Sequence, residues 1–184
     1  MLEKKSREIT SQAFGLLQLG GSSSRAGQRG HSHEQVASRL PSQLIPDEVN
    51  VVVSDRDDGL SERIEAELGA FNAEMTGHPD PQPLRVAAWD GDDLLAGLCG
   101  ATWGGCGYID LIWVRADYRR RGLGSRLLGT GEKEIRLRGC DRVALATYSF
   151  QAPSFYIRAG YTESGRRSDF PRGHGQILLV KQLS

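Results

Sequence analysis

The sequence predicts an α/β domain in which helices flank a mixed central sheet. Two apolar runs joined by the turn Asp90–Asp93, and a third that follows Gly104-Gly105, favour consecutive antiparallel strands. A helical pattern then separates the strand that ends at Val114 from one that begins at Val143, and such a crossover joins parallel strands. The sheet therefore has antiparallel strands first and a parallel pair, its fourth and fifth strands, in the middle. Apolar residues make up 39% of the 184, which suffices for a buried core.

A short strand and a helix come first in this order. The run Val51–Val53 is β-branched and predicts the strand. Ser61 is the expected N-cap of a helix whose apolar residues recur at helical period. Those residues are Ile64, Leu68, Phe71 and Met75. Three prolines between positions 77 and 83 predict a loop after this helix.

The remaining elements complete the order strand-helix-strand-strand-strand-helix-strand-helix-strand-strand. The later strands are predicted at 84–89, 94–103, 108–114, 143–147, from Tyr161 onward and at 176–182. A helix through Leu123 and Ile135 ends before Gly139, which suits the position just past a helix. Pro153 fits the first turn of a short helix that ends before Gly160. A ligand of this sheet is expected at the carboxyl ends of the parallel strands.

Composition divides the chain and excludes several classes. Residues 1–47 are rich in Ser, Gly, Gln and Arg and are expected to be disordered or loosely docked, with organelle targeting or an incorrectly assigned start as alternatives. Residues 48–184 are expected to form the folded domain. A net charge of zero argues against nucleic acid and anionic membranes as partners. The apolar runs are too short to span a membrane, so a cytoplasmic protein is expected.

The cysteines point the same way. Cys99, Cys106 and Cys140 are odd in number and form no C-x-x-C pair. They are therefore read as reduced thiols of a cytosolic protein, and a zinc site or other metal centre is not expected.

The run Arg119-Arg120-Arg121-Gly122-Leu123-Gly124-Ser125 is the strongest candidate for a binding site. It connects the strand ending at Val114 to a helix, and a helix N-terminus presents unpaired N–H groups to an anion. The arginines beside it favour a phosphate-bearing ligand, whereas an ordinary exposed turn is the alternative reading. Neither G-x-x-x-x-G-K-[ST] nor a G-x-G-x-x-G after the first strand is present, so the P-loop and dinucleotide-binding motifs are excluded.

This turn and a second segment, residues 151–161, together resemble the GNAT superfamily of acyl-CoA-dependent N-acetyltransferases. The resemblance covers residues 49–183, and its most specific pieces are 114–125 and 152–161. Residues 150–156 also resemble a bacterial branch that carries Phe-Gln-Ala-Pro-x-Phe-Tyr. The resemblance implies an enzyme that transfers acetyl from acetyl-CoA to a primary amine by direct attack. A CoA-binding sensor or scaffold without turnover is the alternative.

The resemblance also implies which residues hold acetyl-CoA. Backbone N–H groups of the turn hold the pyrophosphate, and Gly122 and Gly124 let it approach the backbone closely. Arg119 braces the turn, and the pantetheine arm pairs with the preceding strand as an extra strand. Ser149 stands where many relatives have Asn. The implied acetyl-CoA residues are Ile112, Trp113, Val114, Arg119, Arg120, Arg121, Gly122, Leu123, Gly124, Ser125 and Ser149.

Two further residues take catalytic roles by the same resemblance. Tyr156 matches the tyrosine near the CoA sulfur, where a phenol can donate a proton to the leaving thiolate. Its alternative is an aromatic residue of the core. Asp110 lies four residues before Val114, on the same face of a regular strand, and is the candidate base. Its alternative is a structural aspartate at the sheet surface.

The acceptor side is read from the loop after the first helix and from the last two strands. Asp80, Asp169 and His174 are the polar residues expected to face the acceptor, and an exposed position without a role is the alternative for each. The loop is short, so an amine on a small molecule or on a peptide or protein would fit. A homodimer is compatible with the sequence.

Overall fold

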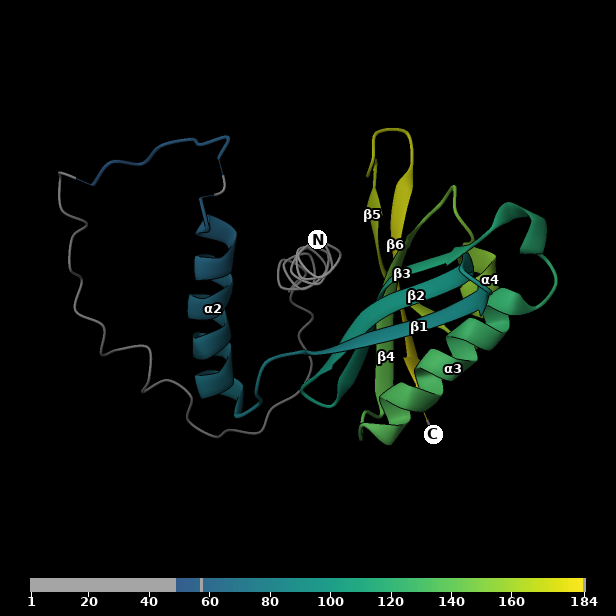
Figure 1. Ribbon diagram of the computed structural model, residues 1–184. Helices are drawn as coiled ribbons and strands as arrows, with labels where there is room; N and C mark the ends of the chain where they lie inside the picture. The colour runs from purple at the N-terminus through teal and green to yellow at the C-terminus, as the bar shows by residue number, and fades with distance from the viewer. Residues whose placement is uncertain (1–48, 57, 184) are drawn as a thin grey trace, which may run out of the picture.

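The computed structural model describes residues 49–56 and 58–183, and its main body is a six-stranded sheet in the order β1-β2-β3-β4-β6-β5 (Figure 1). The described elements are α2 (Leu60–Thr76), β1 (Gln82–Asp90), β2 (Asp93–Trp103), β3 (Cys106–Val114), the 3-10 turn η1 (Ala116–Tyr118), α3 (Leu123–Leu137), β4 (Arg142–Tyr148), α4 (Pro153–Arg158), β5 (Thr162–Ser168) and β6 (Gly175–Gln182). The predicted extension, residues 1–47, lies outside the described residues.

The mixed sheet is confirmed strand by strand. β1, β2 and β3 pair antiparallel in succession, β3 and β4 pair parallel, and β6 joins β4 and β5 antiparallel. The two hairpin turns use Gly91, Gly104 and Gly105 at positive φ, as tight connections between twisted strands require.

Two predictions near the start of the domain are wrong. Val51–Val53 forms no strand, and these residues are 90%, 69% and 104% exposed. A β-branched run forms a strand only where another strand accepts its backbone hydrogen bonds, and no described strand pairs with it. Ser61 is not the N-cap, because α2 begins one residue earlier at Leu60 behind Gly59, whose φ is 78°.

The core lies between the sheet and the two helices α3 and α4. α3 packs across β1, β2 and β3 with Leu127, Leu128 and Ile135 inward. Tyr156 of α4 and Tyr161 after it complete the same core cluster. Burial of these apolar side chains is the main driving force for this arrangement.

Helix α2 forms as its periodicity predicts, but its apolar stripe is not buried. Leu60, Ile64, Leu68, Phe71 and Met75 are each 44–62% exposed, and α2 stands apart from the sheet (Figure 1). Among the described residues, no helix is long and apolar enough to cross a membrane.

Candidate functional site

The first feature of the site is an opening between the parallel strands β3 and β4. Their pairing runs from Cys106↔Arg142 to Ile109↔Leu145 and ends there. β3 continues to Val114 and β4 to Tyr148. Residues 110–114 of β3 therefore pair with β2 on one edge only, and their other edge has no strand partner among the described residues.

A β-bulge sits where the two strands separate. Cys99 pairs with Leu111 and Gly100 with Ile109, so Asp110 is the extra residue on β3. A Cβ on Gly100 would overlap the carbonyl oxygen of Tyr108, so only glycine fits there. Bulges bend the strand that carries them and often lie next to active sites. Sequence reasoning missed this bulge, although a glycine inside a predicted strand is the signal for one.

The bulge corrects one prediction about Asp110. On the N-terminal side of the bulge, Gly107 and Ile109 face α3. On its C-terminal side, Ile112 and Val114 pack toward the core. Strict alternation is thus broken between Asp110 and Val114, and a shared face no longer follows from their spacing. Burial raises the pKa of the Asp110 carboxyl from 3.8 to about 7. A carboxyl with this pKa can take up and release a proton near neutral pH.

The arginine-glycine turn forms the N-terminus of α3 directly after the open stretch of β3. Arg120 and Gly122 have positive φ values of 59° and 82°. The first bond of the helix runs from the Arg126 N–H to the Gly122 carbonyl at 3.0 Å, so the N–H groups of residues 123–125 precede the helical ladder. Arg119 Nε donates to the Val114 carbonyl at 3.0 Å and ties the turn to β3. The turn is therefore a preformed cradle for an anion.

The two glycines of the cradle differ in what they do. A Cβ on Gly122 would meet open space, and glycine is favoured there by its positive φ. A Cβ on Gly124 would lie 3.6 Å from Val114 Cγ2 and 3.7 Å from the Phe155 ring. The Cβ direction of Gly124 thus points toward Val114 of β3 and Phe155 of α4, at ordinary contact distances.

The charges around the cradle are partly compensated. Arg115 pairs with Asp117 at 2.9 Å and lies 4.6 Å from the centre of the Tyr118 ring. The Arg121 guanidinium lies 5.7 Å from the same ring centre. Arg120 and Arg121 remain exposed at the turn and can meet an anionic ligand.

Tyr156 is held by packing on α4, which begins at Pro153. Its side chain is 7% exposed, and its ring meets Phe155 and Tyr161 edge-on at 5.0 and 5.9 Å between ring centres. Burial raises the pKa of the Tyr156 phenol to about 12. The phenol is therefore protonated and uncharged at neutral pH and does not act as a base.

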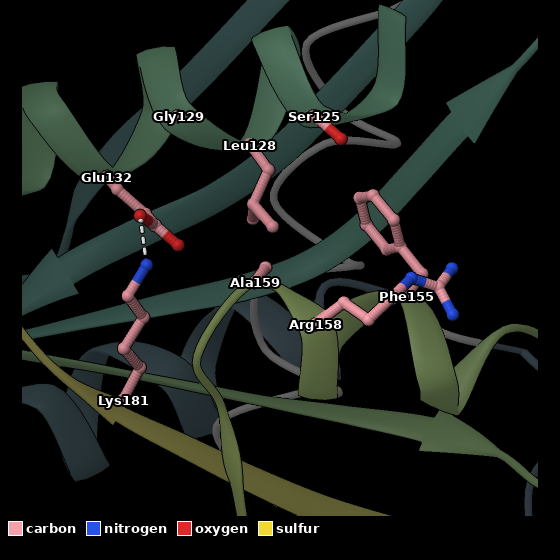
Figure 2. A pocket seen from close by; sticks show the side chains of 8 residues that line it. All are labelled: Ser125, Leu128, Gly129, Glu132, Phe155, Arg158, Ala159 and Lys181. Atoms are coloured by element: carbon pink, nitrogen blue, oxygen red, sulfur yellow. Dashed lines mark hydrogen bonds and ion pairs between the residues drawn. The ribbon is translucent and has the colours of Figure 1, made fainter. Parts of the chain in front are cut away.

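A cavity of about 360 Å³ lies between α3 and α4 and adjoins the cradle through Ser125 (Figure 2). Glu132 and Lys181 form an ion pair in its wall. Arg158 enters the cavity from α4. The lining residues are Ser125, Leu128, Gly129, Glu132, Phe155, Arg158, Ala159 and Lys181. Sequence reasoning missed Glu132. The signal was its spacing, because a residue four positions after the apolar Leu128 lies on the same buried face of the helix, where a carboxylate needs a positively charged partner.

The residues predicted for the acceptor are not brought together as a set. Asp169 Oδ1 accepts the Gly173 N–H at 2.6 Å inside the β5–β6 turn. Asp80 lies next to α2, where a Cβ on Gly69 would be 3.2 Å from its Oδ1. The His174 ring instead contacts Phe150 beyond the end of β4, at 4.8 Å between ring centres.

Ser149, predicted to contact CoA, ties β4 to β6. Its N–H donates to the Gly175 carbonyl at 2.8 Å, and its Oγ accepts the Gly175 N–H at 3.1 Å. The hydroxyl can still donate one hydrogen bond of its own.

Comparison with known proteins finds one family. The profile of the acetyltransferase (GNAT) family matches residues 52–161. Blasticidin-S acetyltransferase of Streptomyces morookaense is 38% identical over 109 residues, which are 56% of this chain and 80% of that protein. Acetyltransferase Atu2258 of Agrobacterium fabrum is 31% identical over 137 residues, which are 73% of this chain and 100% of that protein.

Solved structures agree with this likeness. An acetyltransferase from Bacillus cereus has a TM-score of 0.62 and 26% identity, over 72% of this chain and 98% of that one. An aminoglycoside 6′-N-acetyltransferase complexed with coenzyme A has a TM-score of 0.52 and 18% identity, over 73% of this chain and 98% of that one, which is a likeness of fold.

Proposed function

The chain belongs to the acetyltransferase (GNAT) family, and we propose that it transfers the acetyl group of acetyl-CoA to an amine. One observation carries this proposal. β3 and β4 separate after Ile109 and Leu145, and the free edge of β3 leads straight into the anion cradle at the start of α3. A long ligand with amides at one end and phosphates at the other matches that succession. Acetyl-CoA has this shape and supplies an acetyl group activated as a thioester.

The free edge and the cradle define how the chain would hold this co-substrate. Backbone groups of Ile112, Trp113 and Val114 would pair with the pantetheine amides, as an added strand does. The N–H groups of Leu123, Gly124 and Ser125 would hold the pyrophosphate, with charge from the exposed arginines. The cavity beside Ser125 offers space for the nucleotide end, and Arg158 in its lining would supply a positive charge to a phosphate there. Arg119, Arg120, Arg121, Gly122 and Ser149 complete the proposed set.

The proposed chemistry uses one acid and one base. As the amine nitrogen bonds to the thioester carbonyl carbon, Asp110 would accept the proton that the nitrogen loses, directly or through a water. The pKa of about 7 makes Asp110 a better base at neutral pH than an ordinary carboxylate. As the carbon–sulfur bond breaks, the Tyr156 phenol would donate to the sulfur. The phenol is protonated at neutral pH, as a proton donor must be, and its raised pKa makes it a weaker acid than an ordinary tyrosine.

The cysteines of the chain bear on the compartment in which the enzyme works. Cys99, Cys106 and Cys140 are all free thiols. Free thiols suit a reducing compartment, and we place the enzyme in the cytoplasm of a bacterium.

The test is an acceptor screen with the full chain and acetyl-CoA, read by release of the CoA thiol. The panel contains blasticidin S, because a relative carries that name, together with aminoglycosides, simple amines and peptides with a free amine. We expect thiol release that depends on at least one amine. Tight binding of acetyl-CoA without thiol release for any amine would overturn the proposal and favour a CoA-binding scaffold.

A further inference from the structure

Three aromatic side chains gather at the carboxyl end of β4. The rings of Tyr148 and Phe150 stack with their centres 5.3 Å apart and an angle of 2° between their planes. His174 meets Phe150 edge-on at 4.8 Å and 70°. Phe150 is nonetheless 55% exposed. We call Tyr148, Phe150 and His174 the aromatic platform. The stacked arrangement leaves part of the Phe150 ring surface accessible to a ligand.

Hydrogen bonds of the neighbouring residues hold the platform in place. Ser149, between the two stacked residues, exchanges two hydrogen bonds with Gly175 at 2.8 and 3.1 Å. Gln151 Oε1 accepts the Tyr148 N–H at 3.0 Å and the Thr147 hydroxyl at 3.1 Å. These bonds fix the turn that carries Phe150. A ligand would therefore meet a preorganised surface, which reduces the entropy lost on binding.

The platform lies at the mouth of the opening between β3 and β4. The opening begins after Leu145, three residues before Tyr148 ends β4. Because the two strands run parallel, the carboxyl end of β4 faces the same way as that of β3, where the anion cradle begins. A group resting on Phe150 would thus lie at the end of the sheet where the proposed acetyl transfer takes place.

Charges near the platform argue against a polycationic ligand. The β5–β6 hairpin carries Arg166, Arg167 and Arg172. Of its two carboxylates, Glu163 pairs with Arg166 at 2.8 Å near the start of β5, away from the turn, and Asp169 accepts the Gly173 N–H at 2.6 Å inside the turn. An aminoglycoside carries several positive charges and needs carboxylates that are free to pair with them.

We propose that the aromatic platform binds a planar aromatic or heteroaromatic ring of the acceptor, and that a short linker joins this ring to the acceptor amine. This inference rests on the proposed acetyltransferase activity and names the class of its acceptor. Stacking of aromatic rings contributes energies that correspond to about a threefold to tenfold change in affinity. The same factor is expected in kcat/KM.

The experiment uses matched acceptors, 2-phenylethylamine and 2-cyclohexylethylamine, beside the wider amine panel. The two carry the same amine on the same linker and differ in whether the ring is planar and aromatic. Thiol release from acetyl-CoA by the full chain gives kcat/KM for each. We expect the phenyl compound to be favoured about threefold to tenfold. Phe150→Leu should remove this preference, whereas Phe170→Leu, at an equally exposed phenylalanine (59%), should keep it.

The results that would overturn the aromatic platform differ from those that would overturn acetyl transfer. Equal kcat/KM for the two rings, a preference that survives Phe150→Leu, or aminoglycosides as the best acceptors would overturn the aromatic platform while acetyl transfer stands. Binding of acetyl-CoA without acetylation of any amine would instead overturn the proposed function. Thermal unfolding of both variants checks that neither loss reflects misfolding.

Discussion

Lys181 Nζ lies 2.7 Å from Glu132 Oε2, and this ion pair joins β6 to the buried face of α3 (Figure 2). Glu132 is 7% exposed, and Lys181 also lies 5.6 Å from the centre of the Tyr161 ring. Within the described residues, Glu132 Oε1 and the Tyr161 hydroxyl are buried without a hydrogen-bond partner. Burial, and then the charge of Glu132, raise the pKa of Tyr161. The Lys181 ammonium is therefore the main compensation for a buried carboxylate.

Removing that ammonium should destabilise the fold. Lys181→Met leaves Glu132 uncompensated and should lower the free energy of unfolding by about 3–5 kcal/mol. The double variant Glu132→Leu/Lys181→Met should recover most of the loss, because no buried charge remains. Urea unfolding measures both. Arg166→Met, which breaks a pair with side chains 48% and 41% exposed, should cost much less than Lys181→Met, because solvent screens an exposed pair. Equal costs for Lys181→Met and Arg166→Met would contradict this account.

The pH profile of the reaction tests Asp110 as the base. With a pKa of about 7, its carboxylate forms as the pH rises through neutrality, so kcat/KM should rise over the same range. Asp110→Asn should lose this limb and about 10²-fold in kcat/KM. A weakly basic acceptor amine keeps the titration of the amine out of the measured range. An unchanged profile in the variant would remove Asp110 from the mechanism.

Asp110 should also make stability depend on pH. The pKa of Asp110 is about 7 in the folded protein, and its ordinary value, which applies to the unfolded chain, is 3.8. Between these pH values the folded protein therefore binds more protons at Asp110 than the unfolded chain does. Stability should therefore fall as the pH rises from about 4 to about 7 and level off above that. Asp110→Asn should flatten this contribution and stabilise the protein at pH 8. Thermal unfolding across pH measures it, and a variant with the same slope as the wild type would refute it.

Tyr156 should matter for chemistry and not for CoA binding. Tyr156→Phe keeps the buried ring but removes the donor, so kcat should fall about 10²-fold with little change in the Kd of acetyl-CoA. Tyr161→Phe is the matched control, because it removes a buried hydroxyl that lies beside Glu132 and has no part in the proposed chemistry, so it should leave kcat within about twofold. Equal falls in both variants would point to packing as the cause.

Gly124 should tolerate a methyl group but not a larger side chain. Gly124→Ala places its Cβ in ordinary contact with Val114 and Phe155 and should keep the affinity for acetyl-CoA. Gly124→Leu should displace Phe155, cost about 1–3 kcal/mol of stability and weaken acetyl-CoA binding as the turn moves. Thermal unfolding without ligand separates this from a blocked phosphate site, since a leucine that only blocked phosphate would leave the melting temperature unchanged.

The parts of the fold that were predicted correctly rest on local patterns. Hairpin turns at Asp90–Asp93 and Gly104-Gly105, and the crossover from Val114 to Val143, specify the order and direction of the later strands through turn geometry and periodicity. Val51–Val53 shows the limit of this reasoning. A β-branched run has the propensity for a strand, but the hydrogen bonds that stabilise a strand come from a partner far away in the sequence.

Some features of the candidate site likewise follow from local sequence, and others follow only from the tertiary structure. The sequence by itself determined the turn that forms the anion cradle, because Gly122 and the arginines act through their own backbone and charge. The catalytic role of Tyr156 stays a prediction from a contiguous motif. Only the tertiary structure decided where β3 and β4 part, that Asp110 sits at the bulge with a raised pKa, and that Phe150, Tyr148 and His174 meet. Each depends on strand register and burial, which arise from contacts between segments distant in the chain and leave no local periodicity to read.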